Sequence, residues 1–135
     1  MKITVSAIIN SPIIKVWQFF NDPQHITKWN QAADTWHCPA SENDLKLGGK
    51  FKHTMTAKDN SFSFDFEGVY TQVDLYKQID YTLADDRKVS VYFKEENNQT
   101  TVTEIFETEN ENTLELQQQG WQAILNNFKN YTEHN

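Results

Sequence analysis

The sequence predicts an α+β domain in which one curved antiparallel sheet, of about six to seven strands, wraps around a long C-terminal helix. Three observations lead to this prediction. The run from residue 113 to about residue 133 has helical spacing, and most of the chain before it alternates with the period of strands. Two helix-start signals also follow the first strand directly. The 135 residues are expected to form one domain, 1–135, around one core.

The first strand and the two short helices are expected at the start of the chain. Apolar residues alternate with polar ones over residues 3–9, which indicates a half-buried strand. Ser11 followed by Pro12 predicts a helix N-cap and a first-turn proline. Asp22 followed by Pro23 repeats the same signal and predicts the second helix.

Strands are expected from Asp34 onward, joined by short hairpins that make neighbouring strands antiparallel. After Gly68 the apolar residues change from even to odd positions, through Val69, Val73 and Leu75. A phase change at a glycine suggests a bulge or sharp bend there, and hence a strongly curved sheet. The turn clusters that mark the hairpins are Asp59-Asn60, Asp85-Asp86 and Asn97-Asn98.

The closing helix is expected to bury one face against this sheet, because its apolar residues form a single stripe. Gly120 lies in its interior, where glycine costs about 1 kcal/mol relative to alanine. The missing side chain suggests room for a close neighbour or for a ligand, and thus a cavity between helix and sheet. The stripe consists of Leu114, Gln117, Trp121, Ile124, Leu125, Phe128 and Tyr131.

Composition excludes several classes of function. The net charge of −7 should repel phosphate backbones and anionic membranes, so no nucleic-acid partner is expected. No apolar run approaches the roughly 20 residues of a membrane span, and no signal peptide is visible. A cytoplasmic protein without membrane insertion is therefore expected. The single cysteine excludes an intrachain disulfide, and the aromatic content of 13% indicates a core of large rings that leaves space.

Six segments of the chain together form a familiar pattern: Trp29-Asn30, 34–39, 42–45, 48–51, 64–70 and 120–125. They resemble the START-like superfamily of hydrophobic-ligand proteins, also called SRPBCC proteins. More narrowly, they resemble bacterial proteins classed with the C-terminal domain of the co-chaperone that activates the ATPase of the ninety-kilodalton heat-shock protein. The resemblance covers essentially the whole chain and implies the helix-grip fold.

For function, the resemblance implies less than it does for fold. Members of the superfamily bind lipids, sterols or polyketides, and some catalyse cyclisation or hydrolysis. The N-terminal domain of the co-chaperone has no counterpart in these residues, so a co-chaperone role transfers poorly and a chaperone partner is unsupported.

The residues themselves form no recognisable catalytic set. His37 and Cys38 are strand neighbours that point to opposite faces, so they are not expected to act as a base and a nucleophile. Asp65 and Glu67 are expected to face solvent. The histidines show no metal-ligand spacing, so neither a metal nor a cofactor is expected. His53 is predicted on the inner face, as a core residue, a cavity residue or a general acid or base.

The expected function is binding of a small hydrophobic or aromatic molecule in the cavity between the C-terminal helix and the sheet. Two alternatives remain: a cyclase- or hydrolase-like enzyme acting on a polyketide-like substrate, and a co-chaperone-like interaction module. The predicted ligand-binding residues are Trp36, Phe51, His53, Met55, Phe64, Phe66, Tyr81, Gly120, Trp121 and Leu125.

Overall fold

A computed structural model describes residues 1–135, and it confirms the predicted fold class. Seven strands form one sheet in the order β1-β7-β6-β5-β4-β3-β2, and every neighbouring pair is antiparallel. The elements follow the expected chain order. They are β1 Lys2–Ile9, α1 Ile13–Asn21, α2 Pro23–Trp29, β2 Trp36–Asn43, β3 Lys50–Ala57, β4 Ser63–Asp74, β5 Gln78–Leu83, β6 Lys88–Glu96, β7 Gln99–Glu107 and α3 Leu114–Glu133.

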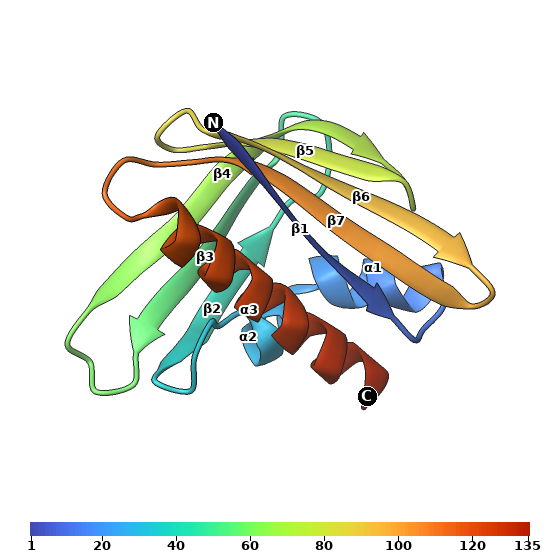
Figure 1. Ribbon diagram of the computed structural model, residues 1–135, viewed down its shortest axis with the longest axis horizontal. Helices are drawn as coiled ribbons and strands as arrows, with labels where there is room; N and C mark the ends of the chain where they lie inside the picture. Colours follow the sequence, from blue (N-terminus) through green and yellow to red (C-terminus); the bar gives the residue numbers. More distant parts are fainter.

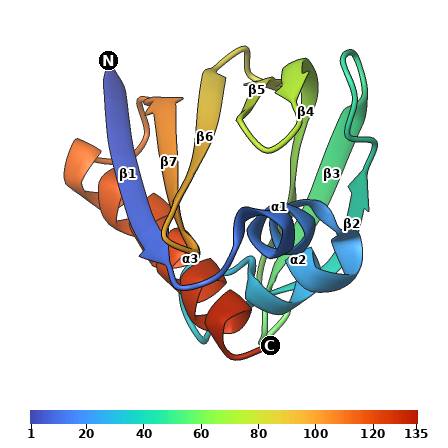
Figure 2. The ribbon, with the colours of Figure 1, turned by 90° about the vertical axis from the view of Figure 1, so that its right-hand side faces the viewer.

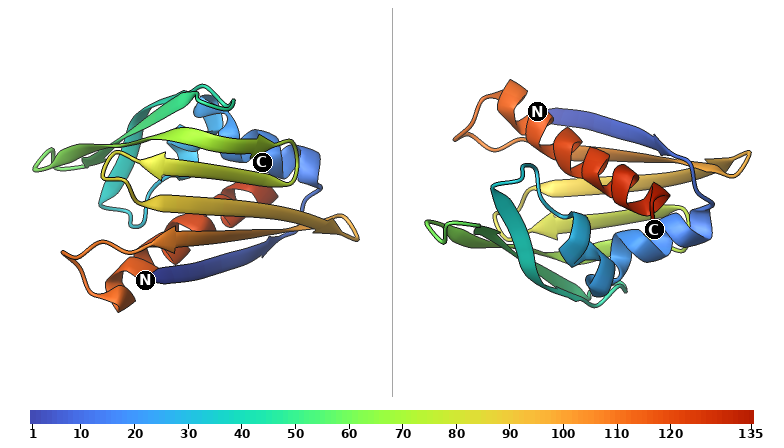
Figure 3. Two further views of the ribbon diagram at one scale, coloured as in Figure 1. Left: turned by 90° about the horizontal axis from the view of Figure 1, so that it is seen from above. Right: turned by 90° about the horizontal axis from the view of Figure 1, so that it is seen from below.

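The sheet curls into a half-barrel, with the three helices across its open side (Figures 1 and 2). The long helix α3 runs along the concave face, beside β1 (Figure 3). The helix α2 packs against β2, and α1 contacts β6 and β7. A single buried cluster joins the sheet to the helices. Phe128 of α3, for example, has its ring edge-on to the rings of Phe20 and Trp29, at 5.2 and 4.9 Å between ring centres.

The helix-start signal was right in one of the two predicted places, and Thr113 is a further N-cap. Asp22 accepts a hydrogen bond from the Gln24 backbone N–H, and Thr113 accepts one from the Leu116 backbone N–H, as N-cap residues do. The expectation for Ser11 was wrong. Pro12 has an extended backbone and is itself the N-cap of α1, without a side-chain cap.

The predicted hairpins are confirmed, and their turn residues adopt the left-handed conformation that Asn and Asp tolerate. Asn60, Asp86, Asn97 and Asn98 have φ values of 62°, 70°, 53° and 62°. Their short connections pair each strand from β3 to β7 with its neighbour along the chain.

The bulge in β4 lies at Thr71 and not at Gly68. The register with β5 is regular up to Tyr70 and shifts before Gln72. Tyr70 therefore lies on the same inner face of the strand as Gly68 and is buried, whereas Val69 is 37% exposed. Leu75, also expected to point inward, is 63% exposed because it follows the end of the strand.

Gly68 serves a close approach between strands. A Cβ atom there would lie 2.6 Å from the Thr82 carbonyl oxygen and 2.9 Å from the Phe51 ring. The absence of a side chain lets the Phe51 ring pack flat across its neighbour strand. Gly68 therefore positions the main aromatic ring of the inner sheet face.

Candidate functional site

A cavity of about 910 Å³ lies between α3 and the concave face of the sheet. Its volume falls in the range of about 300–1,000 Å³ that is usual for small-molecule sites. About half of the residues that line it are hydrophobic. The lining residues come from all three helices, five strands of the sheet and the loops beside them. The cavity predicted from the helix and the strand pattern is therefore present.

Most of the residues predicted to bind a ligand do line this cavity, although their contact with a ligand stays a prediction. Trp36 and Leu125 lie elsewhere. Trp36 packs edge-on against Phe62 and Phe64 outside the cavity, and Leu125 is 1% exposed in the core. Those that line the cavity are Phe51, His53, Met55, Phe64, Phe66, Tyr81, Gly120 and Trp121.

The position of Leu125 follows from helix geometry. Ile124 lines the cavity, and the next residue along an α-helix is turned by about 100° about the axis. Leu114, the first residue of the predicted stripe, is 44% exposed, so the buried stripe of α3 begins at Gln117. A stripe read from spacing alone does not separate residues that face a cavity from residues that fill the core.

Gly120 opens the helix side of the cavity. A Cβ atom built on it would meet nothing within 4 Å. The close-neighbour explanation for this glycine is thus wrong, because no atom needs the space. Beside it, Trp121 is stacked on Phe106 of β7, with 4.1 Å between ring centres and 8° between ring planes. The helix therefore presents a gap next to a rigidly held indole ring.

Phe51 of β3 is the centre of the aromatic wall on the sheet. Its ring lies 4.9 Å from Tyr81, 5.3 Å from Tyr70 and 5.1 Å from His53, measured between ring centres. Such pairs add about 0.5–1.5 kcal/mol each beyond the area they bury. Phe51 is edge-on to Tyr81 and tilted against Tyr70, so the rings brace one another on the sheet side of the cavity.

His53 lies in this wall as a neutral imidazole. Burial lowers its pKa to about 4, and its Nδ1 atom is 2.8 Å from the hydroxyl of Ser41 on β2. A histidine with this pKa carries no charge at neutral pH and is poorly suited to act as a general acid there. Its suitable roles are therefore hydrogen bonding and packing.

Glu104 is a cavity residue that the sequence reasoning missed. It lies on β7 at an inward position, between Val102 and Phe106 on the same strand face. The side chain is 8% exposed, and burial raises its pKa to about 8. No hydrogen bond or ion pair from the protein reaches its carboxyl group. The available signal was an acidic residue within the inward phase of a strand, where apolar residues are expected.

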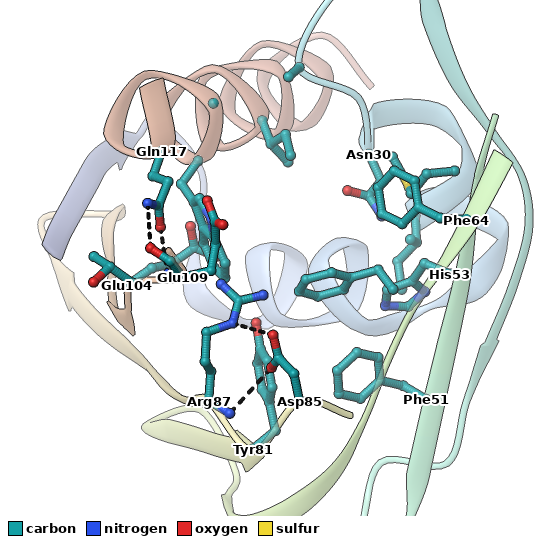
Figure 4. A pocket seen from close by; sticks show the side chains of 18 of the residues that line it. Asn30, Phe51, His53, Phe64, Tyr81, Asp85, Arg87, Glu104, Glu109 and Gln117 are labelled. Atoms are coloured by element: carbon teal, nitrogen blue, oxygen red, sulfur yellow. Dashed lines mark hydrogen bonds and ion pairs between the residues drawn. The ribbon is translucent and has the colours of Figure 1, made fainter. Parts of the chain in front are cut away.

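The phenol of Tyr81 is a further polar group on the inner sheet face. Its pKa is raised well above the usual value, first by burial and then by the charge of Glu104. Tyr81 of β5 and Glu104 of β7 are separated by β6 alone. Figure 4 shows Glu104 across the cavity from His53, with Tyr81 and Arg87 at one end.

Polar contacts hold the rim of the cavity at the end where Tyr81 and Arg87 lie. The Arg87 Nε atom donates to an Asp85 carboxylate oxygen at 2.7 Å. Gln117 of α3 donates to the backbone oxygens of Glu109 and Asn112 and accepts from the Glu109 backbone N–H. Gln117 thereby ties the loop after β7 to the helix (Figure 4). This role explains why a polar residue occupies the buried stripe.

The remaining candidate residues lie outside the cavity. Cys38 is buried, its thiol donates to the Ala40 carbonyl oxygen, and burial raises its pKa, which opposes a nucleophilic role. Asp65 and Glu67 are exposed, as expected. No cluster of three or more His, Cys, Asp or Glu residues has a metal-binding arrangement. None of the helices combines the length and apolar character needed to cross a membrane.

A half-barrel closed around a long helix, with an aromatic cavity between them, defines the helix-grip class of the START/SRPBCC superfamily. Within that class, the family described as "Activator of Hsp90 ATPase homolog 1-like protein" matches residues 10–133. The chain therefore belongs to the AHSA1-like family.

Solved structures agree with this assignment. An AHSA1-like protein from Aeromonas hydrophila is 44% identical, with a TM-score of 0.93 over 99% of this chain and 93% of that chain. Protein Chr148 from Cytophaga hutchinsonii is 53% identical, with a TM-score of 0.85 over 98% and 92%. Protein CV1439 from Chromobacterium violaceum shares the fold at 21% identity, with a TM-score of 0.86 over 98% of each chain. No curated protein matches significantly.

Proposed function

We propose that this protein binds a small hydrophobic or aromatic molecule in the cavity between α3 and the sheet. The observation that carries the proposal is the open, aromatic-lined space of about 910 Å³ beside Gly120. Burial of apolar ligand surface against these rings would contribute roughly 25 cal/mol per Å². The family assignment supports the same role, because proteins of this fold commonly bind hydrophobic ligands.

Filling the cavity from the helix tests this proposal. We expect Gly120→Leu to weaken binding of the neutral fluorescent probe N-phenyl-1-naphthylamine at least about 10-fold, because the new side chain occupies the space that the probe needs. Binding is measured by the rise in probe fluorescence during titration. The wild-type protein is expected to bind the probe.

The matched control is Gln118→Leu, which adds the same side chain to an exposed position of the same helix. It should leave probe binding within about 2-fold of wild type, an effect of less than 0.5 kcal/mol. The proposal fails if the wild-type protein binds no apolar probe. Equal weakening by both variants would also count against it, because the loss would then follow from an added leucine and not from the filled cavity.

A further inference from the structure

Glu104 is the buried group whose presence the fold does not explain. Its neighbours across the two adjacent strands are Val5 of β1 and Val91 of β6, both almost completely buried. A carboxyl group among apolar residues costs free energy unless it finds a hydrogen-bond partner. The protein supplies none, so the partner of this group is expected in the cavity that it lines.

The surroundings of Glu104 determine whether its carboxyl group is protonated or ionised when a ligand binds. The titratable groups that act on the same region are Tyr81, Tyr70 and Arg87. On β1 the inward neighbour is apolar, and α3 presents Gln117 and Trp121, which do not titrate. Three other acidic residues lie at the rim. Asp85 binds Arg87, the carboxylate of Glu109 accepts backbone N–H groups of its own loop, and Glu111 is exposed.

No cation is therefore placed against Glu104, and its carboxyl group is protonated at neutral pH. A protonated carboxyl is a hydrogen-bond donor with an acidic O–H group. The Tyr81 hydroxyl, which is also protonated and has no partner in the protein, is a second donor at this end of the cavity. Two neutral donors in an apolar site are suited to a ligand oxygen that only accepts hydrogen bonds.

We infer that the ligand of this cavity carries a carbonyl oxygen on an aromatic or otherwise apolar body, and that the Glu104 carboxyl donates a hydrogen bond to that oxygen. The inference rests on the proposed function, because it requires a ligand in the same cavity. The aromatic wall around Phe51 and Trp121 holds the body of the ligand, and the Glu104 and Tyr81 end holds its oxygen. Glu104 thus selects ketones over hydrocarbons of the same shape.

A pair of probes separates the inference from the proposed function. The first is the ketone 2-acetylnaphthalene, and the second is 2-isopropylnaphthalene, which has a similar shape and no acceptor. Both are titrated at about pH 6.5 against the wild-type protein, Glu104→Met and Glu104→Gln, with Trp fluorescence as the signal. Methionine removes the donor at similar volume, whereas glutamine keeps an N–H donor and cannot ionise.

We expect Glu104→Met to weaken ketone binding about 5- to 10-fold, the effect of one lost hydrogen bond, and to leave hydrocarbon binding unchanged. Glu104→Gln should bind the ketone as the wild type does. Above about pH 8 ketone binding should weaken in the wild type and stay constant in Glu104→Gln, because the wild-type carboxyl ionises. The carbonyl infrared band of the bound ketone should lie at lower frequency in the wild type than in Glu104→Met.

Other outcomes overturn the inference in distinct ways. One such outcome is that the wild type and Glu104→Met bind the ketone equally well while the hydrocarbon also binds. This result would exclude the role of Glu104 and leave the proposed function intact. Tighter wild-type binding of 2-(aminomethyl)naphthalene than of the ketone, lost in Glu104→Gln, would show that an ionised Glu104 binds cations instead. If the wild type binds none of the probes, the proposed function and the inference fail together.

Discussion

At the scale of single residues, two buried ionisable groups on the inner sheet face have pKa values that differ from their usual values. Burial lowers the pKa of His53 to about 4 and raises that of Glu104 to about 8. Both shifts favour the uncharged form, as expected for groups in an apolar site. The inner face therefore combines polar atoms with no net charge of its own at neutral pH.

The stability of the protein should depend on pH through Glu104. Below about pH 4.5 this group is protonated in both the folded and the unfolded chain. Between about pH 4.5 and 8 the unfolded chain loses the proton while the folded chain keeps it, so the free energy of unfolding falls as pH rises.

Glu104→Gln removes this titration. We expect its free energy of unfolding, relative to wild type, to increase between about pH 4.5 and 8, by at most about 1.4 kcal/mol per pH unit. Urea unfolding at several pH values measures the difference. Asp65→Gln, at an exposed strand position, serves as the control and should show no comparable trend. A constant difference between Glu104→Gln and wild type at all pH values would contradict the expected protonation.

At the scale of secondary-structure elements, two glycines have opposite surroundings. Gly68 in β4 has backbone and ring atoms closer than a Cβ atom allows, whereas Gly120 in α3 has open space. The first glycine permits the close approach of the Thr82 backbone and the Phe51 ring. The second lies in a helix interior where it lowers helix stability, so its advantage must be the volume of the cavity.

Alanine substitutions should therefore change stability with opposite signs. We expect Gly68→Ala to destabilise the protein by about 1–3 kcal/mol, because the new methyl group meets the Thr82 carbonyl oxygen and the Phe51 ring. We expect Gly120→Ala to stabilise it by about 1 kcal/mol through helix propensity. Thermal and urea unfolding measure both. Destabilisation by Gly120→Ala would mean that this glycine serves packing after all.

At the scale of the whole molecule, the half-barrel and α3 enclose a space that the core does not fill. The sheet supplies a rigid aromatic wall, and the helix supplies Gly120 and the stacked Trp121. The open cavity is a cost to the protein without a ligand, because the apolar rings that line it stay in contact with water. An occupant of the cavity should recover part of this cost.

Ligand binding should therefore stabilise the fold as a whole. At a concentration of 100 times Kd, a ligand that binds only the folded chain adds about 2.7 kcal/mol to the free energy of unfolding. We expect a matching rise in Tm with N-phenyl-1-naphthylamine, measured by circular dichroism. The rise should be at most about half as large for Gly120→Leu at the same concentration, because a 10-fold higher Kd leaves only about 1.4 kcal/mol of stabilisation. A similar rise in both proteins would indicate binding outside the cavity.

Local sequence signals determined much of this architecture. The order of the elements, the hairpins at Asn and Asp turns, and the caps at Asp22 and Thr113 all depend on residues close together in the chain. Alternation along β3 and β5 likewise indicated that Phe51, His53 and Tyr81 face inward. Period and turn chemistry are local properties, and local properties can be read from one sequence.

Only the tertiary structure decided which inward-facing residues line the cavity and which fill the core. Leu125 and Ile124 are neighbours in one stripe, yet the first fills the core and the second lines the cavity. The environment of Glu104 also depends on strands far away in the sequence, since Val5 and Val91 surround it. Burial and pKa are set by such distant neighbours, and for that reason the pattern of β7 alone did not reveal the most distinctive polar group of the cavity.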